Sequence, residues 1–234
     1  MHQTAMRNGA RFFDVYVKKI TAPTIVEIGA RNVNGSLRSI VPEQVKYVGV
    51  DLVAAPSVDV VLEDPYKLPF EDNSIDAVVC SSCFEHAEFF WETFLEIQRV
   101  LKPDGLFYMN APSNGDFHRY PVDCWRFYPD SGVALARWAQ RKGYRTTLLE
   151  SYTGRQEDDI WADQICIFVK DSSMASRYPD RITANFSAFN NGISYPQLDI
   201  YLNEQSRSQD QRRAVIWHFT QRARRAIKRV MARV

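Results

Sequence analysis

The sequence has little of what marks secreted, membrane-spanning or nucleic-acid-binding proteins. It holds only four cysteines, without zinc-ribbon spacing, so we expect free thiols in a reducing compartment. No apolar stretch is long enough to cross a bilayer, and residues 1–10 lack the apolar core of a signal peptide. The net charge is only +1, which predicts no specific nucleic-acid partner. Together these absences predict a cytoplasmic protein.

What the sequence does have is an ordinary globular composition, with 45% hydrophobic and 24% charged residues in a chain of 234. Apolar runs typical of strands alternate with helical periodicity as far as residue 170. This alternation predicts an α/β fold, a Rossmann-like, seven-stranded, mostly parallel sheet with helices on both faces. Only a loop separates the last two runs, Tyr144–Leu149 and Gln164–Val169, so we expect one of these strands to be antiparallel.

The expected helices and strands follow from this periodicity. We expect helices over residues 9–20, 34–40, 89–101 and 129–141. We expect strands over residues 24–28, 45–51, 58–62, 75–80, 106–111, 144–149 and 164–169.

The chain divides into a catalytic domain at residues 1–170 and a C-terminal extension at residues 171–234. Residues 171–210 are polar, and we interpret them as an ordered surface wrap or a linker. Residues 211–234 show helical periodicity with eight basic and no acidic side chains. We expect this basic amphipathic helix to dock on the chain or on a second copy, or to contact the inner face of a membrane peripherally.

The loop after the first strand is the expected cofactor site, because ligands bind beyond the carboxyl ends of parallel strands. Gly29 allows close backbone approach there, and Gly35 allows a tight turn. Asp51 ends the second strand and can accept hydrogen bonds from ribose hydroxyls, which fits NAD or S-adenosylmethionine. The loop lacks G-x-G-x-x-G, and the carboxylate of Glu27 disfavours a pyrophosphate. A cationic cofactor that carries an amino acid is therefore favoured.

This loop resembles motif I of the class I S-adenosylmethionine-dependent methyltransferases, E/D-x-G-x-G-x-G, with Arg31 in place of the middle glycine. Residues 62–70, 73–79, 85–86 and 99–105 resemble the segments that follow it, in the order typical of the bacterial methyltransferase type 11 branch. The resemblance covers about residues 22–112, and it implies methyltransferase activity with S-adenosyl-L-methionine as cofactor.

The resemblance also implies roles for individual residues. Glu27 and the Gly29–Arg31 backbone would hold the methionine end, Asp51 the ribose and Asp64 the adenine amine. Ser81 and Ser82 would line the wall beneath the sulfonium. The full implied cofactor set is Glu27, Gly29, Ala30, Arg31, Gly35, Asp51, Leu52, Asp64, Ser81 and Ser82.

The segment after the fifth strand, residues 113–128, is unusually dense in aromatic and charged side chains. We assign His118 as the general base because an imidazole titrates near working pH. Asp123 would orient His118 or bind a sugar hydroxyl, and His86 is the competing base. Each of these side chains could instead serve only as a cap or a loop-stabilising group.

Aromatic faces combined with carboxylate and guanidinium groups commonly hold sugar rings. The expected substrate-binding residues are Tyr120, Trp125, Arg126 and Glu85, although Trp125 could simply belong to the core. The H-x-x-P-x-D-x-W-R-F run also resembles methyltransferases of bacterial surface-polysaccharide biosynthesis. Residues 152–163 could form the other wall or bind a metal; we favour a solvated acidic loop and assign no metal ligands.

The sequence therefore predicts an S-adenosylmethionine-dependent O-methyltransferase that acts on a saccharide or glycolipid acceptor. One alternative is a methyltransferase for a quinone, a lipid or another small molecule, which would want an apolar acceptor pocket. Another is a non-catalytic Rossmann-like binding protein, which only Arg31 in the glycine loop supports.

Overall fold

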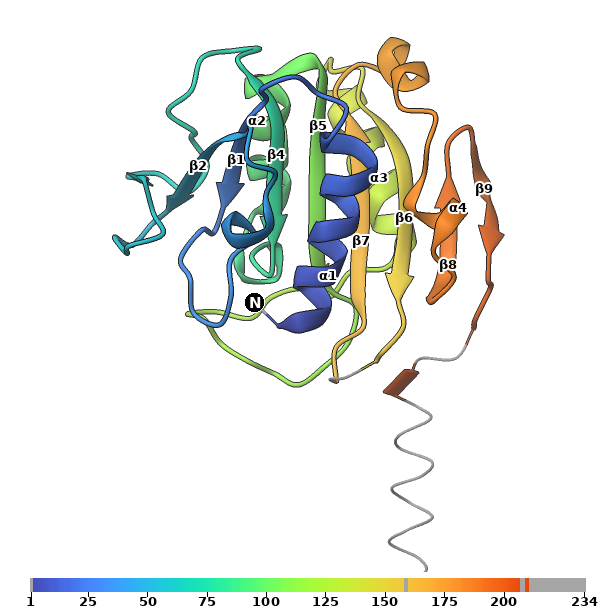
Figure 1. Cartoon of the computed structure of the whole chain (residues 1–234). Coiled ribbons are helices and arrows are strands. Elements are labelled where there is room, and N and C mark those ends of the chain that lie inside the picture. Colours follow the sequence, from blue (N-terminus) through green and yellow to red (C-terminus); the bar gives the residue numbers. More distant parts are fainter. Residues whose placement is uncertain (1, 158–159, 207–208, 211–234) are drawn as a thin grey trace, which may run out of the picture. The chain divides into compact units, whose positions relative to one another are not determined.

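One sheet with the strand order β3-β2-β1-β4-β5-β7-β6-β8-β9 organises the chain (Figure 1). The structure is a computed structural model that describes residues 2–157, 160–206 and 209–210. The chain separates into two units, Met1–Glu204 and Gln205–Val234, and the sheet lies in the first. The basic helix expected at residues 211–234, like Asp158 and Asp159 of the acidic loop, lies outside the described residues.

The strands are β1 (Thr24–Ile28), β2 (Lys46–Asp51), β3 (Val60–Val61), β4 (Ile75–Ser81), β5 (Leu101–Pro112), β6 (Thr147–Gly154), β7 (Asp163–Val169), β8 (Phe189–Ser194) and β9 (Gln197–Leu202). The α-helices are α1 (Gln3–Phe12), α2 (Phe90–Val100), α3 (Pro129–Arg141) and α4 (Ile182–Asn185). A π-helical turn, η1 (Phe13–Val17), extends α1, and the short 3-10 helices are η2 (Leu37–Ile40), η3 (Phe84–His86) and η4 (Ser172–Arg177).

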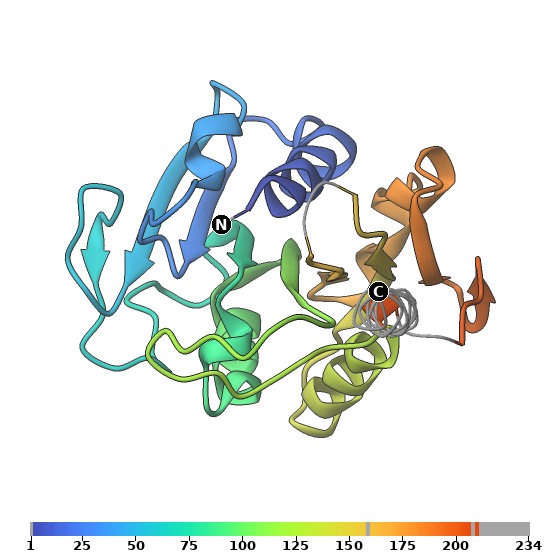
Figure 2. The same cartoon turned by 90° about the horizontal axis from the view of Figure 1, so that it is seen from below.

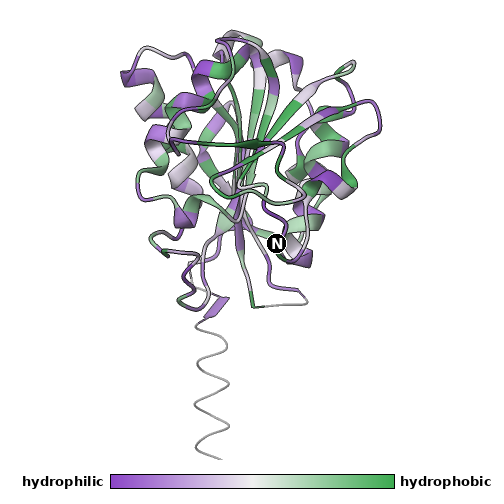
Figure 3. Ribbon diagram, turned by 90° about the vertical axis from the view of Figure 1, so that its left-hand side faces the viewer, coloured by the Kyte–Doolittle hydropathy of each residue, from purple (hydrophilic) through white to green (hydrophobic). Residues whose placement is uncertain are grey.

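Helices cover both faces of the sheet, as predicted. Helix α1 and η1 pack on one face of the sheet (Figure 1). There Phe12 and Tyr16 share a buried cluster with Tyr108 of β5. Helices α2 and α3 pack on the other face, where Phe94 and Leu135 share a cluster with the opposite side chains of the strands. The strands between these layers are predominantly hydrophobic (Figure 3). Successive strand residues thus pack alternately into two separate cores, as expected of a sheet buried on both sides.

The strand directions bring the predicted site to one edge of the sheet. Strands β1 to β5 pair in parallel, whereas β7 is antiparallel to both β5 and β6. The expectation of an antiparallel strand near the end of the sheet is therefore confirmed. The carboxyl ends of β1, β2 and β4 lie on the lower side of Figure 1, and residues 113–128 run across this side (Figures 1 and 2). The N-terminus lies at the same edge.

The expected number of seven strands is wrong, because the sheet has nine strands within the described residues. The polar segment after residue 170 supplies β8, which pairs antiparallel with β6, and β9, which pairs with β8. Most residues of β9 are exposed, so its sequence lacks the contrast between buried and exposed positions that marks a strand. Within the described residues, no helix is both long and apolar enough to cross a membrane.

Candidate functional site

The loop after β1 is held tightly against the end of β2. The amides of Gly29 and Ala30 both donate to the carbonyl of Val50, at 3.0 and 3.1 Å. Gly29 has a φ of +76°, and a Cβ there would lie 2.8 Å from the Cβ and Sγ of Cys83. Glycine is therefore required at this position both for its conformation and for its close approach to the segment after β4.

Asp51, the last residue of β2, is hydrogen-bonded to the same loop. Its carboxylate accepts the amides of Arg31 at 3.0 Å and Val53 at 3.1 Å. A carboxylate has about four acceptor positions, so lone pairs remain for hydroxyl groups of a ligand. Leu52 follows with an exposed side chain. The carboxylate of Asp64 accepts a hydrogen bond from the amide of Tyr66 at 2.8 Å, which stabilises the turn that contains both residues.

Glu27 is buried, and its described contacts are with groups of the protein itself. Its Oε2 accepts from Ser36 Oγ at 3.5 Å, just before η2, and Arg38 and Tyr47 also face it. Burial raises the pKa of the Glu27 carboxyl, and the hydroxyl and guanidinium groups around it oppose that shift. Glu27 therefore fixes the far end of the loop. Nearby, the amide of Gly35 donates to Asn32 Oδ1 at 2.9 Å.

The ends of β4 and β5 present polar atoms that the described residues leave without hydrogen-bond partners. These atoms are Ser81 Oγ and Asn110 Nδ2, both buried. Ser82 adopts a φ of +53°, and its amide donates to the carbonyl of Asn110 at 2.8 Å. Buried polar atoms without partners are rare in proteins, so this edge fits a polar ligand. The predicted cofactor residues thus supply a close-approach glycine, a strand-end carboxylate and open polar groups.

Glu85 and His86 follow β4 in the short helix η3. Glu85 is 1% exposed, and burial raises the pKa of its carboxyl to about 8. Asp163 raises that pKa further, whereas Arg126 opposes the shift. The Nδ1 of His86 contacts the carbonyl of Val122, and burial lowers the pKa of this imidazole. His86 is therefore neutral at working pH, with its Nε2 3.8 Å from Glu85 Oε1.

Residues 113–128 return to η3 and are pinned there. The amide of Cys124 donates to the carbonyl of Glu85 at 2.8 Å, and that of Phe127 donates to Pro112 at 3.0 Å. Asp123 accepts from both guanidinium nitrogens of Arg126, at 2.6 and 2.9 Å, and from the amide of His118 at 2.7 Å. The guanidinium beside it holds the pKa of Asp123 well below its usual range.

His118 stands between His86 and Trp161. Its ring centroid lies 5.0 Å from that of His86 and 4.9 Å from that of Trp161. Its Nδ1 lies 3.0 Å from the carbonyl oxygen of Asp116 and 3.4 Å from Asp123 Oδ2. Arg126 Nη2, which can only donate, lies 3.5 Å from the same Nδ1. The shorter contact to the Asp116 carbonyl favours the proton on Nδ1, which leaves the Nε2 lone pair open. The structure thus brings His118, Asp123, Arg126, Glu85 and His86 together.

The expected substrate-binding residues are placed unevenly. Tyr120 is exposed, and its ring centroid lies 5.7 Å from the guanidinium carbon of Arg31 in the loop after β1. Trp125 donates its indole N–H to the carbonyl of Ala87 at 2.9 Å and packs against Phe90, so it supports the fold. Arg126 is paired with Asp123. Tyr120 alone of these side chains is exposed and joins the two loops.

Sequence reasoning missed the contribution of the N-terminal helix and β7. Asn8 Nδ2 donates to Asn110 Oδ1 at 3.2 Å, and His2 Nε2 lies 3.3 Å from Asp163 Oδ1. The ring of His2 also stacks on Trp161, with 5.9 Å between centroids. No local pattern signals these contacts, because they join residues more than 100 positions apart.

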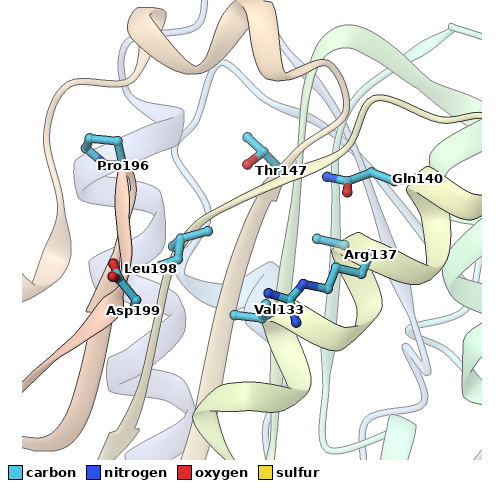
Figure 4. A pocket seen from close by; sticks show the side chains of 8 residues that line it. Val133, Arg137, Gln140, Thr147, Pro196, Leu198 and Asp199 are labelled. Atoms are coloured by element: carbon cyan, nitrogen blue, oxygen red, sulfur yellow. The ribbon is translucent and has the colours of Figure 1, made fainter.

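A pocket of about 270 Å³ lies elsewhere, between α3 and β9 (Figure 4). Its lining residues are Val133, Ala136, Arg137, Gln140, Thr147, Pro196, Leu198 and Asp199. None of them is a predicted site residue.

Known proteins resemble this chain in sequence and in fold. A methyltransferase-domain family matches residues 34–109. An uncharacterized methyltransferase of Schizosaccharomyces pombe is 34% identical over 95 residues, which is 35% of this chain and 36% of that protein. The chain thus matches about a third of the length of this curated relative.

Among solved structures, the chain is similar to 1,6-didemethyltoxoflavin-N1-methyltransferase of Burkholderia thailandensis, with bound 1,6-didemethyltoxoflavin and S-adenosylhomocysteine. The TM-score is 0.57 at 15% identity, over 73% of this chain and 80% of that one. The cyclase SpnF gives a TM-score of 0.54 at 14% identity, over 72% and 82%.

Over residues 34–109 the chain matches a methyltransferase domain, and with the fold this match identifies a methyltransferase that depends on S-adenosylmethionine. S-adenosylmethionine is its cofactor.

Proposed function

We propose that this chain methylates a hydroxyl group of a saccharide, in the biosynthesis of a bacterial polysaccharide or glycolipid. The observation that carries the proposal is the polar cluster of His118, Asp123, Arg126, Glu85 and His86 at the carboxyl edge of the sheet. Tyr120 stands exposed beside it. Carboxylate, imidazole and guanidinium groups offer the hydrogen bonds that a polyhydroxylated acceptor needs, and an exposed ring offers a stacking surface.

S-adenosylmethionine supplies a methyl group activated on a sulfonium. The chain must hold the acceptor oxygen in line with that methyl group and accept one proton. We assign the proton to His118 Nε2, because the carbonyl of Asp116 lies 3.0 Å from Nδ1 and favours the hydrogen there. Asp123 acts as a positioning residue, since Arg126 already neutralises its charge. His86 is the second candidate base.

Apart from that of Glu27, the proposed cofactor contacts keep the roles that the motif resemblance implies. Asp51 binds the ribose hydroxyls, the Gly29–Arg31 backbone lies along the methionine end, and Ser81 lies beneath the sulfonium. Glu27 acts on the cofactor through the loop that it fixes. The side chain of Arg31 extends toward Tyr120, so Arg31 in place of a glycine leaves the backbone contacts of the loop intact.

The test is methyl transfer from labelled S-adenosylmethionine to a panel of oligosaccharides and sugar glycosides, beside quinones and lipid alcohols. We expect a saccharide to be methylated on oxygen. His118→Gln keeps a polar tip but removes the base, so it should abolish turnover and leave S-adenosylhomocysteine affinity unchanged in calorimetry. NADH serves as the cofactor control in that titration.

Transfer to a quinone or lipid alone would replace the saccharide by the alternative acceptor class. Unchanged turnover in His118→Gln would move the base to His86. Absence of S-adenosylhomocysteine binding would favour a non-catalytic binding protein.

A further inference from the structure

Three potential metal ligands converge beside the proposed acceptor site. Glu85 and His86 come from η3 after β4, and His118 comes from the loop after β5. One ligand atom from each, all three within 4.8 Å of one another, could face a common ion. Two imidazoles and one carboxylate form a ligand set that catalytic zinc and non-haem iron sites use.

Both histidines are oriented as metal-binding histidines usually are. Their Nδ1 atoms face oxygen acceptors, the carbonyl of Val122 for His86 and the Asp116 carbonyl with the Asp123 carboxylate for His118. Ligand histidines typically donate one ring N–H to such acceptors, which fixes the tautomer and aims the other nitrogen at the ion. The open atoms are then the two Nε2 lone pairs.

The carboxylate of Glu85 provides an independent sign that a ligand is bound here. Glu85 is almost fully buried, and within the described residues its Oε2 has no hydrogen-bond partner. A buried carboxylate without donors is costly, and such groups are normally paired or coordinated to a metal. The charge of Arg126 also acts on this carboxyl, and His86 Nε2, itself a potential ligand, lies 3.8 Å from Oε1.

We propose that Glu85, His86 and His118 bind one divalent transition-metal ion, of which zinc is the best fit. A tetrahedral zinc ion with bonds of about 2.1 Å separates its ligand atoms by about 3.4 Å. The ligand atoms, now within 4.8 Å, need to approach by about 1.4 Å. His118 lies in a loop without regular structure and can supply this movement. Three protein ligands leave a coordination position for an oxygen atom of a hydroxylated acceptor.

The metal proposal goes beyond the proposed function, although it uses the same side chains. When the ion is bound, the Nε2 lone pair of His118 is used for coordination and cannot take a proton. An acceptor hydroxyl bound to the ion would have a lowered pKa and would lose its proton to solvent water before the methyl group is transferred. Asp123 keeps the same role with or without the ion, because it holds the loop through the amide of His118 and lies 3.4 Å from Nδ1.

The test uses the full chain, stripped with a chelator and titrated with Co²⁺, whose visible absorption reports coordination directly. We expect one Co²⁺ per chain, displaced by Zn²⁺. Glu85→Gln, His86→Gln and His118→Gln should each weaken binding by more than about 100-fold, and Asp123→Asn by about 10-fold. His2→Gln is the matched histidine control, because His2 lies near Trp161 and is no member of the triad; it should bind Co²⁺ normally.

Absence of Co²⁺ and Zn²⁺ binding, or binding that survives all three ligand substitutions, would overturn the metal site. Thermal unfolding and S-adenosylhomocysteine affinity, measured on the same samples, show whether each variant is folded. If the metal-free protein transfers methyl groups and binds no Co²⁺ or Zn²⁺ at any metal concentration tested, the metal site alone would be overturned. Metal binding without transfer to any saccharide would overturn the proposed acceptor alone.

Discussion

Gly29 lies so close to Cys83 that no side chain fits between the loop after β1 and the segment after β4. A Cβ added to Gly29 would lie 2.8 Å from both the Cβ and the Sγ of Cys83. Gly29 thus connects the proposed cofactor loop with the segment that leads directly to Glu85.

Gly29→Ala is therefore expected to impair both stability and cofactor binding. The clash and the positive φ together should cost about 2–4 kcal/mol of unfolding free energy. The displaced loop should also weaken S-adenosylhomocysteine binding by at least about 10-fold, which corresponds to about 1.4 kcal/mol of binding free energy. Urea unfolding and calorimetry measure the two effects.

Gly143→Ala is the control, because Gly143 has a φ of +92° but no atom within 4 Å of its added Cβ. It should cost only about 1 kcal/mol, with normal cofactor affinity. Equal losses of affinity in the two variants would contradict the packing argument.

Asp51→Ala is expected to weaken S-adenosylhomocysteine binding by about 10- to 100-fold, since charge-assisted hydrogen bonds contribute about 1.5–3 kcal/mol. The variant loses the acceptor of the Arg31 and Val53 amides and the proposed ribose contact at once. Asp76→Asn is the matched variant at the opposite edge, where Asp76 accepts from Lys102 and the amide of Thr24. It should change stability alone. A similar drop in affinity there would show that the effect of Asp51 is not local.

Tyr16 and Glu150 form a buried link between η1 and β6. The Tyr16 hydroxyl donates to Glu150 Oε1 at 2.6 Å, and the amides of Ile182 and Thr183 donate to the same carboxylate. Tyr16→Phe should cost about 1.5–3 kcal/mol, the usual worth of a hydrogen bond to a charged group.

Tyr201→Phe removes a hydroxyl that donates to Asp130 at the same distance of 2.6 Å, but at an exposed position. It should change the free energy of unfolding by less than about 0.5 kcal/mol. Chemical denaturation of both variants makes the comparison, and equal costs would mean that burial does not set the strength of the Tyr16 bond.

The pair of Asp123 and Arg126 predicts a pH dependence of stability. Arg126 lowers the pKa of Asp123 in the folded chain, so the stabilisation is complete above the unfolded pKa of about 3.9 and is lost as pH falls below it. Unfolding free energies measured from pH 6 to pH 3 should therefore fall less steeply in Asp123→Asn than in the natural chain. Glu43→Gln removes an exposed carboxyl and should keep the natural slope. A slope unchanged in Asp123→Asn would contradict the linkage.

Periodicity sufficed for the buried elements of this fold. Helix α3 begins and ends where predicted, at Pro129 and Arg141, and the apolar runs of β1 and β4 appear as strands. Periodicity failed at the edges, because β3 has only two residues and β9 is largely exposed. Such strands are fixed by pairing with a neighbour, which leaves little trace in their own sequence.

In the candidate site, too, the sequence predicts some contacts and not others. His118 and Asp123 are close in sequence, so their proximity could be inferred from their loop. The position of Trp161 against His118, and of Asn8 against Asn110, depends on how distant segments pack. The partnering of Arg126 with Asp123 is likewise a property of the folded loop, which the sequence alone does not signal.

The pinning of residues 113–128 at Glu85 and Pro112 has an evolutionary consequence. This single stretch carries most of the proposed acceptor chemistry, whereas the proposed cofactor groups precede it in the chain. A replacement of this stretch that keeps its anchoring amides, at Ser113, Cys124, Trp125 and Phe127, and the packing of Trp125 and Phe127 on Phe90 would leave the sheet and the cofactor half unchanged. New acceptor preferences can therefore arise by recombination within one short exchangeable segment.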